Sequence, residues 1–174
     1  MKEVFPQLNN KAEKEEKGKT LYHFSLDPGK IQKTGFRSSE FIDEGIGARG
    51  KSLMGTYFFE DLDAVKNYTF LTENIEKRHN RKGKNLVAEL DSDAKILDSS
   101  KDNNALYMKE VNGFRAKSNL EPGTLEFSRE FTKYLREKGY DAIKIFSSLL
   151  GNHTEIIVIN EGKLKYKGEL QQVL

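Results

Sequence analysis

A glycine-rich segment, Gly45–Ser52, has the residue types of a phosphate-binding loop. Its sequence, GIGARGKS, matches the pattern G-x-x-x-x-G-K-S, in which glycines let backbone N–H groups converge on phosphate oxygens and the lysine adds charge. A P-loop follows a buried strand and opens a helix. Here the preceding residues are acidic and the following aromatic run favours a strand. Three interpretations therefore stay open: a plain surface loop, a P-loop, and a loop whose Arg49 or Lys51 contacts another phosphate.

Three other polar residues, His23, Tyr57 and Glu155, lie in short predicted strands where core residues would be expected. Because strand side chains alternate between faces, Glu155 shares a face with Ile157 and Ile159. A carboxylate in that setting is costly unless it is paired or takes part in chemistry. Each residue also has an ordinary explanation: a satisfied core histidine, a packing tyrosine, and a glutamate at the solvent end of a strand.

The predicted strands and helices do not alternate regularly along the chain. Strands are predicted at Leu21–Ser25, Thr56–Phe59, Leu86–Asp91, Lys95–Leu97, Tyr140–Phe146, Glu155–Asn160 and Lys163–Lys167, and helices at Glu60–Asn67 and Thr124–Lys138. Asp27–Gly29 is predicted to be a turn, or Pro28 the first residue of a short helix through Lys33. In the last helix, Leu125, Phe131 and Leu135 form one apolar face. Asn74–Lys84 is predicted to be a polar connector, and no element is favoured from Lys101 to Pro122. This order predicts an α+β fold rather than a doubly wound sheet.

Composition limits the function classes. The 174 residues contain no cysteine, which excludes a disulfide framework, a thiolate metal site and a catalytic thiol, and we expect no metal site. Residues 1–19 read as a polar lead-in and residues 20–174 as one domain. No apolar run is long enough for a membrane span, and no signal peptide is recognisable, so we expect a cytoplasmic protein with no membrane contact. With 29 basic and 27 acidic residues, a whole-surface nucleic-acid binder is not indicated.

In combination, the strand motifs resemble the ADP-ribosyltransferase fold, in its diphtheria-toxin and poly(ADP-ribose) polymerase branch. The motifs are LYHFS at 21–25 followed by GFR at 35–37, GTYF at 55–58 with Ala64 and Tyr68 downstream, and TEIIVI at 154–159 preceded by GYDAI at 139–143. The two tyrosines, 57 and 68, are spaced as in the family. The resemblance spans residues 21–160. It implies a split β-sandwich with flanking helices and NAD, as a substrate, in the cleft between two small twisted sheets.

The resemblance also implies residue roles. His23 would bond the adenosine-side ribose, and Tyr57 and Tyr68 would stack on the nicotinamide. Glu155 would bond the 2′-hydroxyl of the nicotinamide ribose and stabilise an oxocarbenium-like transition state. Phe24 and Ser25 would continue the donor-binding strand. Arg37 would lie near adenine or pyrophosphate, and Arg49 or Lys51 would meet the pyrophosphate. On this interpretation His23, Tyr57 and Glu155 converge in one cleft.

The implied activity is transfer of a single ADP-ribose from NAD to a macromolecule, a protein rather than a nucleic acid, as in small bacterial toxins and phage effectors. The alternatives are a non-catalytic binding protein on the same fold and a P-loop nucleotide-binding protein. Two positions depart from the family. The glycine that bonds the nicotinamide amide is Phe24 here, and the serine three residues before the second tyrosine is Val65. We therefore expect weak binding of NAD. The oligomeric state is left open.

A basic cluster lies between Lys77 and Lys84, with five Lys or Arg residues among eight. It is either a solvated connector or a contact for a nucleic acid or an acidic protein. No aromatic residue interleaves it for base stacking, which favours the solvated connector.

Overall fold

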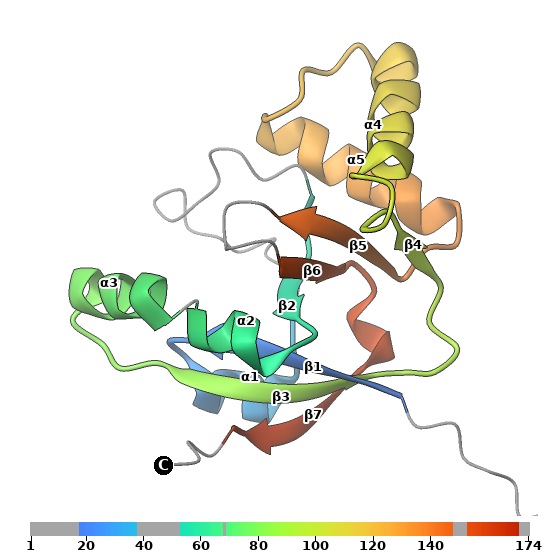
Figure 1. The fold of residues 1–174 in the computed structure, drawn as a ribbon. Coiled ribbons are helices and arrows are strands. Elements are labelled where there is room, and N and C mark those ends of the chain that lie inside the picture. The colour runs from blue at the N-terminus through green and yellow to red at the C-terminus, as the bar shows by residue number, and fades with distance from the viewer. Residues whose placement is uncertain (1–17, 38–52, 68, 148–152, 171–174) are drawn as a thin grey trace, which may run out of the picture.

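The chain folds around a seven-stranded mixed sheet with strand order β4-β5-β6-β2-β1-β3-β7 (Figure 1). The structure is a computed structural model and describes residues 18–37, 53–67, 69–147 and 153–170. Within those ranges, neighbouring strands are antiparallel except for β4 and β5, which run parallel. The predicted α+β class is confirmed at this level.

The elements have the following bounds. The strands are β1 (Lys19–Ser25), β2 (Thr56–Phe59), β3 (Lys84–Leu90), β4 (Ile96–Asp98), β5 (Ala142–Ser147), β6 (His153–Val158) and β7 (Leu164–Glu169). The helices are α1 (Pro28–Thr34), α2 (Leu62–Asn67), α3 (Thr69–His79), α4 (Ala105–Ser118) and α5 (Leu125–Glu137), with a short 3-10 turn at Glu161–Lys163. β1 thus begins at Lys19, the residue at which the polar lead-in was expected to end.

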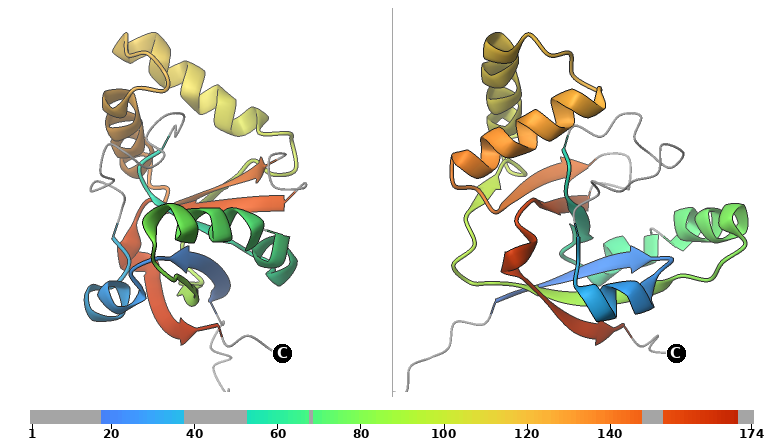
Figure 2. Two further views of the ribbon diagram at one scale, coloured as in Figure 1. Left: turned by 90° about the vertical axis from the view of Figure 1, so that its left-hand side faces the viewer. Right: turned by 180° about the vertical axis from the view of Figure 1, so that it is seen from behind.

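The sheet has a weak junction between β1 and β2. In the described ranges these two strands pair at one position, Tyr22 opposite Phe59, whereas β1 and β3 pair at seven positions and β2 and β6 at four. Figure 1 shows β1, β3 and β7 gathered at the bottom of the view, below β2, β6 and β5, and the rear view in Figure 2 shows the same division. A four-strand part, β4-β5-β6-β2, and a three-strand part, β1-β3-β7, therefore meet along a short seam, which we call the β1–β2 seam.

Helices α4 and α5 cover one face of the four-strand part. Their buried aromatic residues pack with Leu97, Ile143 and Ile157 of the sheet and with Ile159, which follows β6. On α5 the buried positions are Phe127, Phe131 and Leu135. Leu125, expected on this apolar face, is 44% exposed. It is the first residue of the helix, because the Thr124 side chain accepts a hydrogen bond from the Phe127 N–H at 3.1 Å and caps the helix there.

The opposite face carries a separate core. There Leu21, Phe58, Leu86, Ile156 and Val158 pack with Phe36, which follows α1. Residues from both parts of the sheet contribute to this core, so it fastens the two parts together beneath the β1–β2 seam.

Two helices differ from the sequence prediction. The connector expected at Asn74–Lys84 is wrong in its first half, because α3 runs from Thr69 to His79. That helix has no apolar stripe to reveal it, and Glu76 fastens its end by accepting a hydrogen bond from the Gly83 N–H at 2.7 Å. Helix α4 occupies the stretch to which no element was assigned. Its buried residues, Tyr107, Val111 and Phe114, have helical spacing, which two Asn-rich turn signals obscured.

Gly55, immediately before β2, is required by close packing. A Cβ placed there would lie 2.7 Å from the Val158 carbonyl oxygen and 2.8 Å from Ile157 Cγ2, both of β6. We expect Gly55→Ala to lower the free energy of unfolding by about 1–3 kcal/mol, the usual effect of overpacking. Gly113→Ala, in α4 where a Cβ meets nothing, should raise it by about 0.5–1 kcal/mol. Urea unfolding measures both, and equal effects at the two glycines would contradict this packing.

Candidate functional site

Tyr57 and Glu155 lie on one face of the four-strand part. Phe59 of β2 is opposite Glu155 of β6, and Glu155 is opposite Ile145 of β5. Since side chains alternate along a strand, Tyr57 and Phe59 point to the same side as Glu155. The carboxylate is therefore flanked by Ile145 on one neighbouring strand and by Phe59 on the other, with Tyr57 diagonal to it.

Two apolar clusters border the Glu155 carboxylate. Tyr57 and Ile145 belong to the core beneath α4 and α5. Phe59 packs with Ala64 and Val65, which α2 places over the sheet, and with Tyr22 of β1. Glu155 is only partly exposed between these clusters. A carboxylate in such partly dry surroundings interacts strongly with any positive charge that develops beside it.

The Tyr57 phenol stays protonated in this environment. Burial, followed by the nearby Tyr107 phenol and the Glu155 carboxylate, raises the pKa of Tyr57 well above its usual value. Its hydroxyl donates a hydrogen bond to the Leu53 carbonyl at 3.3 Å. The ring is thus held as a neutral aromatic surface next to Glu155, which suits stacking rather than proton transfer.

His23 lies at the β1–β2 seam. Its Nδ1–H donates a hydrogen bond of 2.8 Å to the Tyr57 carbonyl, and its ring packs against Phe36 and Phe58. Tyr22, the preceding residue, shares the face of Phe59, so the His23 side chain lies on the other face. We expected all three side chains to converge in one cleft, but the structure places His23 on the face opposite to Tyr57 and Glu155. It joins His23 to the backbone of Tyr57, while Glu155 shares a face with the Tyr57 ring.

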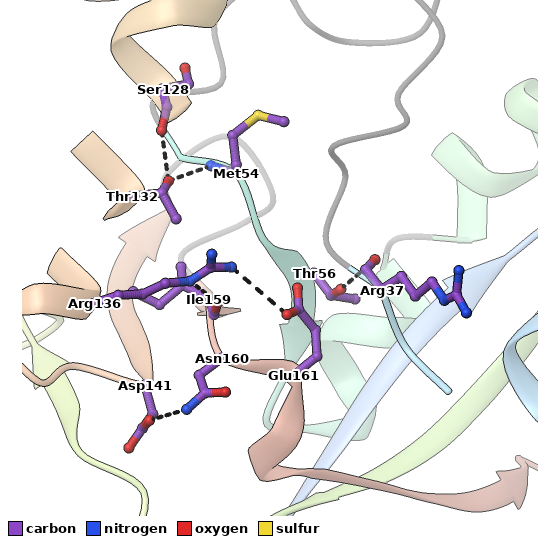
Figure 3. Close-up of polar contacts among 10 residues, drawn as sticks. All are labelled: Arg37, Met54, Thr56, Ser128, Thr132, Arg136, Asp141, Ile159, Asn160 and Glu161. Atoms are coloured by element: carbon purple, nitrogen blue, oxygen red, sulfur yellow. Dashed lines mark hydrogen bonds and ion pairs between the residues drawn. The ribbon is translucent and has the colours of Figure 1, made fainter. Parts of the chain in front are cut away.

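The expected donor-binding residues Phe24, Ser25 and Arg37 lie in three different environments. Phe24 shares the face of Tyr22, and its ring lies directly against Gly83, where a Cβ would clash with it. The Ser25 hydroxyl accepts a hydrogen bond from the Asp27 N–H at 3.0 Å and so belongs to a turn. Arg37 is exposed on the His23 side, and its carbonyl accepts a 3.3 Å hydrogen bond from the Thr56 hydroxyl (Figure 3).

Three predicted site residues, Tyr68, Arg49 and Lys51, lie outside the described residues. The chain that follows the Gly45–Ser52 loop is described from residue 53. It passes through two bends into β2, an antiparallel strand, rather than into the helix that a P-loop opens.

The basic cluster of residues 77–84 is largely paired with carboxylates. Arg81 forms an ion pair with Asp27, Lys82 with Glu76 at 3.0 Å, and Lys84 with Glu169 at 2.6 Å. Three of the five basic side chains thus face a carboxylate, which favours the interpretation of this segment as a solvated surface.

Sequence reasoning missed a buried polar pair that positions β2. The Thr132 hydroxyl of α5 accepts a hydrogen bond from the Met54 N–H at 2.9 Å and donates one to the Ser128 carbonyl at 2.7 Å (Figure 3). The side chains of Ser128 and Thr132, both on α5, are buried. The only available signal was the presence of two small hydroxyl residues among the apolar positions of an amphipathic helix.

A hollow of about 380 Å³ lies beyond the end of β6, lined by Arg136, Tyr140, Asp141, Asn160 and Glu161 among others. Its polar groups bond to one another (Figure 3). Arg136 Nε donates to the Ile159 carbonyl at 2.6 Å, and the Asn160 amide donates to Asp141 at 2.7 Å. These bonds hold the turn after β6 against α5. We therefore attribute the polar lining of the hollow to the packing of this turn and not to a binding site.

No protein-family model and no curated protein matches this chain. Within the described ranges, none of the helices has the length and apolar character needed to cross a membrane, and no group of three or more His, Cys, Asp or Glu side chains is placed to hold a metal ion.

Proposed function

We propose that this protein is an NAD-dependent mono-ADP-ribosyltransferase with the split β-sandwich of that family, acting on a protein acceptor. The observation that carries the proposal is the placement of Tyr57 and Glu155 on one face of adjacent strands, next to the β1–β2 seam. An aromatic ring, a partly dry carboxylate and an incomplete strand pairing would together suit a flat, cationic ring such as the nicotinamide of NAD.

In this proposal NAD lies across the β1–β2 seam. On the Glu155 side, Tyr57 would stack on the nicotinamide and Glu155 would bond the adjoining ribose. On the other side, His23 and the exposed Arg37 would meet the adenosine-side ribose and the adenine or pyrophosphate. Because His23 and Glu155 lie on opposite faces, the proposal requires the donor to reach both faces at the seam, where β1 and β2 pair at one position, Tyr22 with Phe59.

The proposed reaction breaks one bond and forms one bond at the same carbon atom. The bond between the ribose anomeric carbon and the nicotinamide nitrogen breaks, and its electron pair neutralises the positive charge on the nicotinamide ring. Positive charge develops on the ribose as this happens. Glu155 would stabilise that charge, while the acceptor forms the new bond to the anomeric carbon. Only interactions that strengthen in the transition state accelerate this step.

A non-catalytic binding protein is the second candidate. It is favoured by the two departures at the expected nicotinamide-amide contacts: Phe24 packs on Gly83, and Val65 is buried with Phe59. Release of free nicotinamide from NAD, followed by chromatography in the presence of a bacterial cell extract, separates the candidates. Release above the spontaneous rate supports the transferase. NAD binding in calorimetry without release supports the binding protein. If the protein does not bind NAD, both candidates are wrong.

His23→Ala tests the proposed adenosine side. Removing the imidazole abolishes its bond to the Tyr57 carbonyl and the proposed ribose contact. We expect the Kd for NAD to rise about tenfold or more, equivalent to roughly 1.4 kcal/mol. Cleavage of bound NAD at saturation should change less. Thr20→Ala, at an exposed position of the same strand, is the control. A fall in the rate at saturation with an unchanged Kd would place His23 in the chemical step instead.

A further inference from the structure

The peptide group between Leu53 and Met54 is hydrogen-bonded on both sides. Its carbonyl accepts a bond from the Tyr57 hydroxyl at 3.3 Å, and its N–H donates to the Thr132 hydroxyl of α5 at 2.9 Å. The Thr132 hydroxyl in turn donates to the Ser128 carbonyl at 2.7 Å (Figure 3). One continuous series of hydrogen bonds, which we call the Tyr57–Thr132 network, therefore runs from the Tyr57 ring through the main chain into α5.

The part of this network nearest to α5 is shielded from water. Leu53, Met54 and Thr132 are all buried. A buried N–H or carbonyl that loses its partner costs more free energy than the bond itself contributes, because no water takes the partner's place. Bonds that follow one another in a series also polarise and strengthen each other. The Met54 N–H is therefore firmly tied to the Thr132 hydroxyl.

The main chain between Met54 and Tyr57 is held by β6 as well. Gly55 lies so close to β6 that a Cβ placed there would be 2.7 Å from the Val158 carbonyl oxygen. Tyr57 itself pairs with Ile157 in the ladder between β2 and β6. This short segment is thus fixed by α5 at its start and by β6 at its end.

The Tyr57 ring is consequently held at both ends of its long axis. The strand β2 fixes its Cβ, and the Leu53 carbonyl fixes its hydroxyl. A flat ring stacks well only when its plane is correctly oriented, and a side chain that is already immobilised loses little freedom when a ligand binds. The orientation of the ring depends on the peptide group that accepts its hydroxyl, and Thr132 fixes that peptide group.

We propose that Thr132 is a positioning residue for the nicotinamide-binding part of the site, acting through the Leu53–Met54 peptide group on the Tyr57 ring. This inference rests on the proposed transferase function. It adds a residue of α5 to which the family resemblance gives no role. The assignment has a distinctive consequence: Thr132 affects the binding of ligands that carry the nicotinamide and has no effect on ligands that lack it.

Two ligands that differ at the nicotinamide test this assignment. NAD carries the nicotinamide, whereas ADP-ribose has a hydroxyl in its place. Calorimetry gives the Kd of each ligand for wild type, Thr132→Val, Thr132→Ser, Tyr57→Phe and the double variant of Thr132→Val with Tyr57→Phe. Valine keeps the shape of threonine without the hydroxyl, and serine keeps the hydroxyl. Leu135→Val is the control, because it trims a fully buried side chain of the same helix and leaves the network intact.

We expect Thr132→Val to raise the Kd for NAD about 3–10-fold, the effect of having to immobilise one freed side chain, and to leave the Kd for ADP-ribose unchanged. Thr132→Ser should bind both ligands as wild type does. Tyr57→Phe should resemble Thr132→Val, and the double variant should lose no more than either single variant, because both changes break the same network. Leu135→Val should lower the Tm without changing either Kd.

An equal rise of both Kd values in Thr132→Val would indicate a general loss of structure, and an unchanged Kd for NAD would show that the ring does not depend on Thr132. Either result overturns the assignment. An unchanged Kd for NAD in Tyr57→Phe overturns it as well, even if Thr132→Val does not fold. If wild type bound neither NAD nor ADP-ribose, the transferase proposal itself would fail, and this inference with it.

Discussion

Glu155→Gln is expected to lower the turnover of NAD by about 10²–10³-fold, roughly 3–4 kcal/mol of transition-state stabilisation. Glutamine keeps the size and hydrogen-bonding ability of the side chain but removes the negative charge facing the developing ribose cation. Because the carboxylate lies between Ile145 and Phe59, little water replaces that charge. Single-turnover measurement of nicotinamide release gives the rate directly.

Binding should respond differently from turnover. Ground-state NAD presents a neutral hydroxyl to Glu155, which glutamine can still bond, so the Kd and the Tm should stay close to those of wild type. Glu121→Gln, at an exposed glutamate paired with Arg115, is the matched control and should leave all three quantities unchanged. A variant at position 155 that kept the wild-type turnover would show that Glu155 has no part in the chemistry.

Phe131→Ala is expected to produce the largest loss of stability, about 3–5 kcal/mol. The ring projects from α5 into the core, where it is fully buried and contacts the rings of Tyr107, Phe114 and Phe127. For a chain of this size each kcal/mol shifts the Tm by roughly 2–4 °C, so the Tm should fall by about 6–20 °C. Thermal unfolding followed by circular dichroism measures the change.

Lys133→Ala is the control for Phe131→Ala, because it alters an exposed position of the same helix. Its effect should stay within about 0.5 kcal/mol. A small effect at Phe131, comparable with that at Lys133, would mean that α5 does not pack on the sheet as described. Since Thr132 of α5 also holds Met54, a destabilised α5 should loosen the chain just before β2.

The sequence was most informative where a local pattern reports directly on burial. The strand at Thr56–Phe59 has the predicted bounds, and the α5 helix was predictable from the amphipathic spacing that ends at Gly139, although Thr124, predicted as its first residue, is its cap. Helix α3 was not predictable, because a polar helix without an apolar stripe depends on tertiary contacts such as those of Glu76. Helix α4 was hidden because its apolar residues are interrupted by Asn112 and Gly113.

The candidate site was predictable within each strand but not between strands. Alternation correctly placed His23 on the face of Leu21, and Glu155 on the face of Ile157. Which face of β1 matches which face of β6 depends on the register at Tyr22 and Phe59, a single long-range pairing that no local pattern encodes. For the same reason no local pattern indicates that His153 and Asp61, 92 residues apart (153 − 61), lie within ion-pair distance.

The most direct test of the transferase proposal follows the two ends of NAD separately. The protein is incubated with a bacterial cell extract and with NAD labelled either in the adenylate or in the nicotinamide, and labelled macromolecules are identified by mass spectrometry. The proposal predicts that adenylate label appears on protein while nicotinamide label is released in equal amount, and that Glu155→Gln abolishes both. Release of nicotinamide without any transfer, or no consumption of NAD by the wild-type protein, would contradict it.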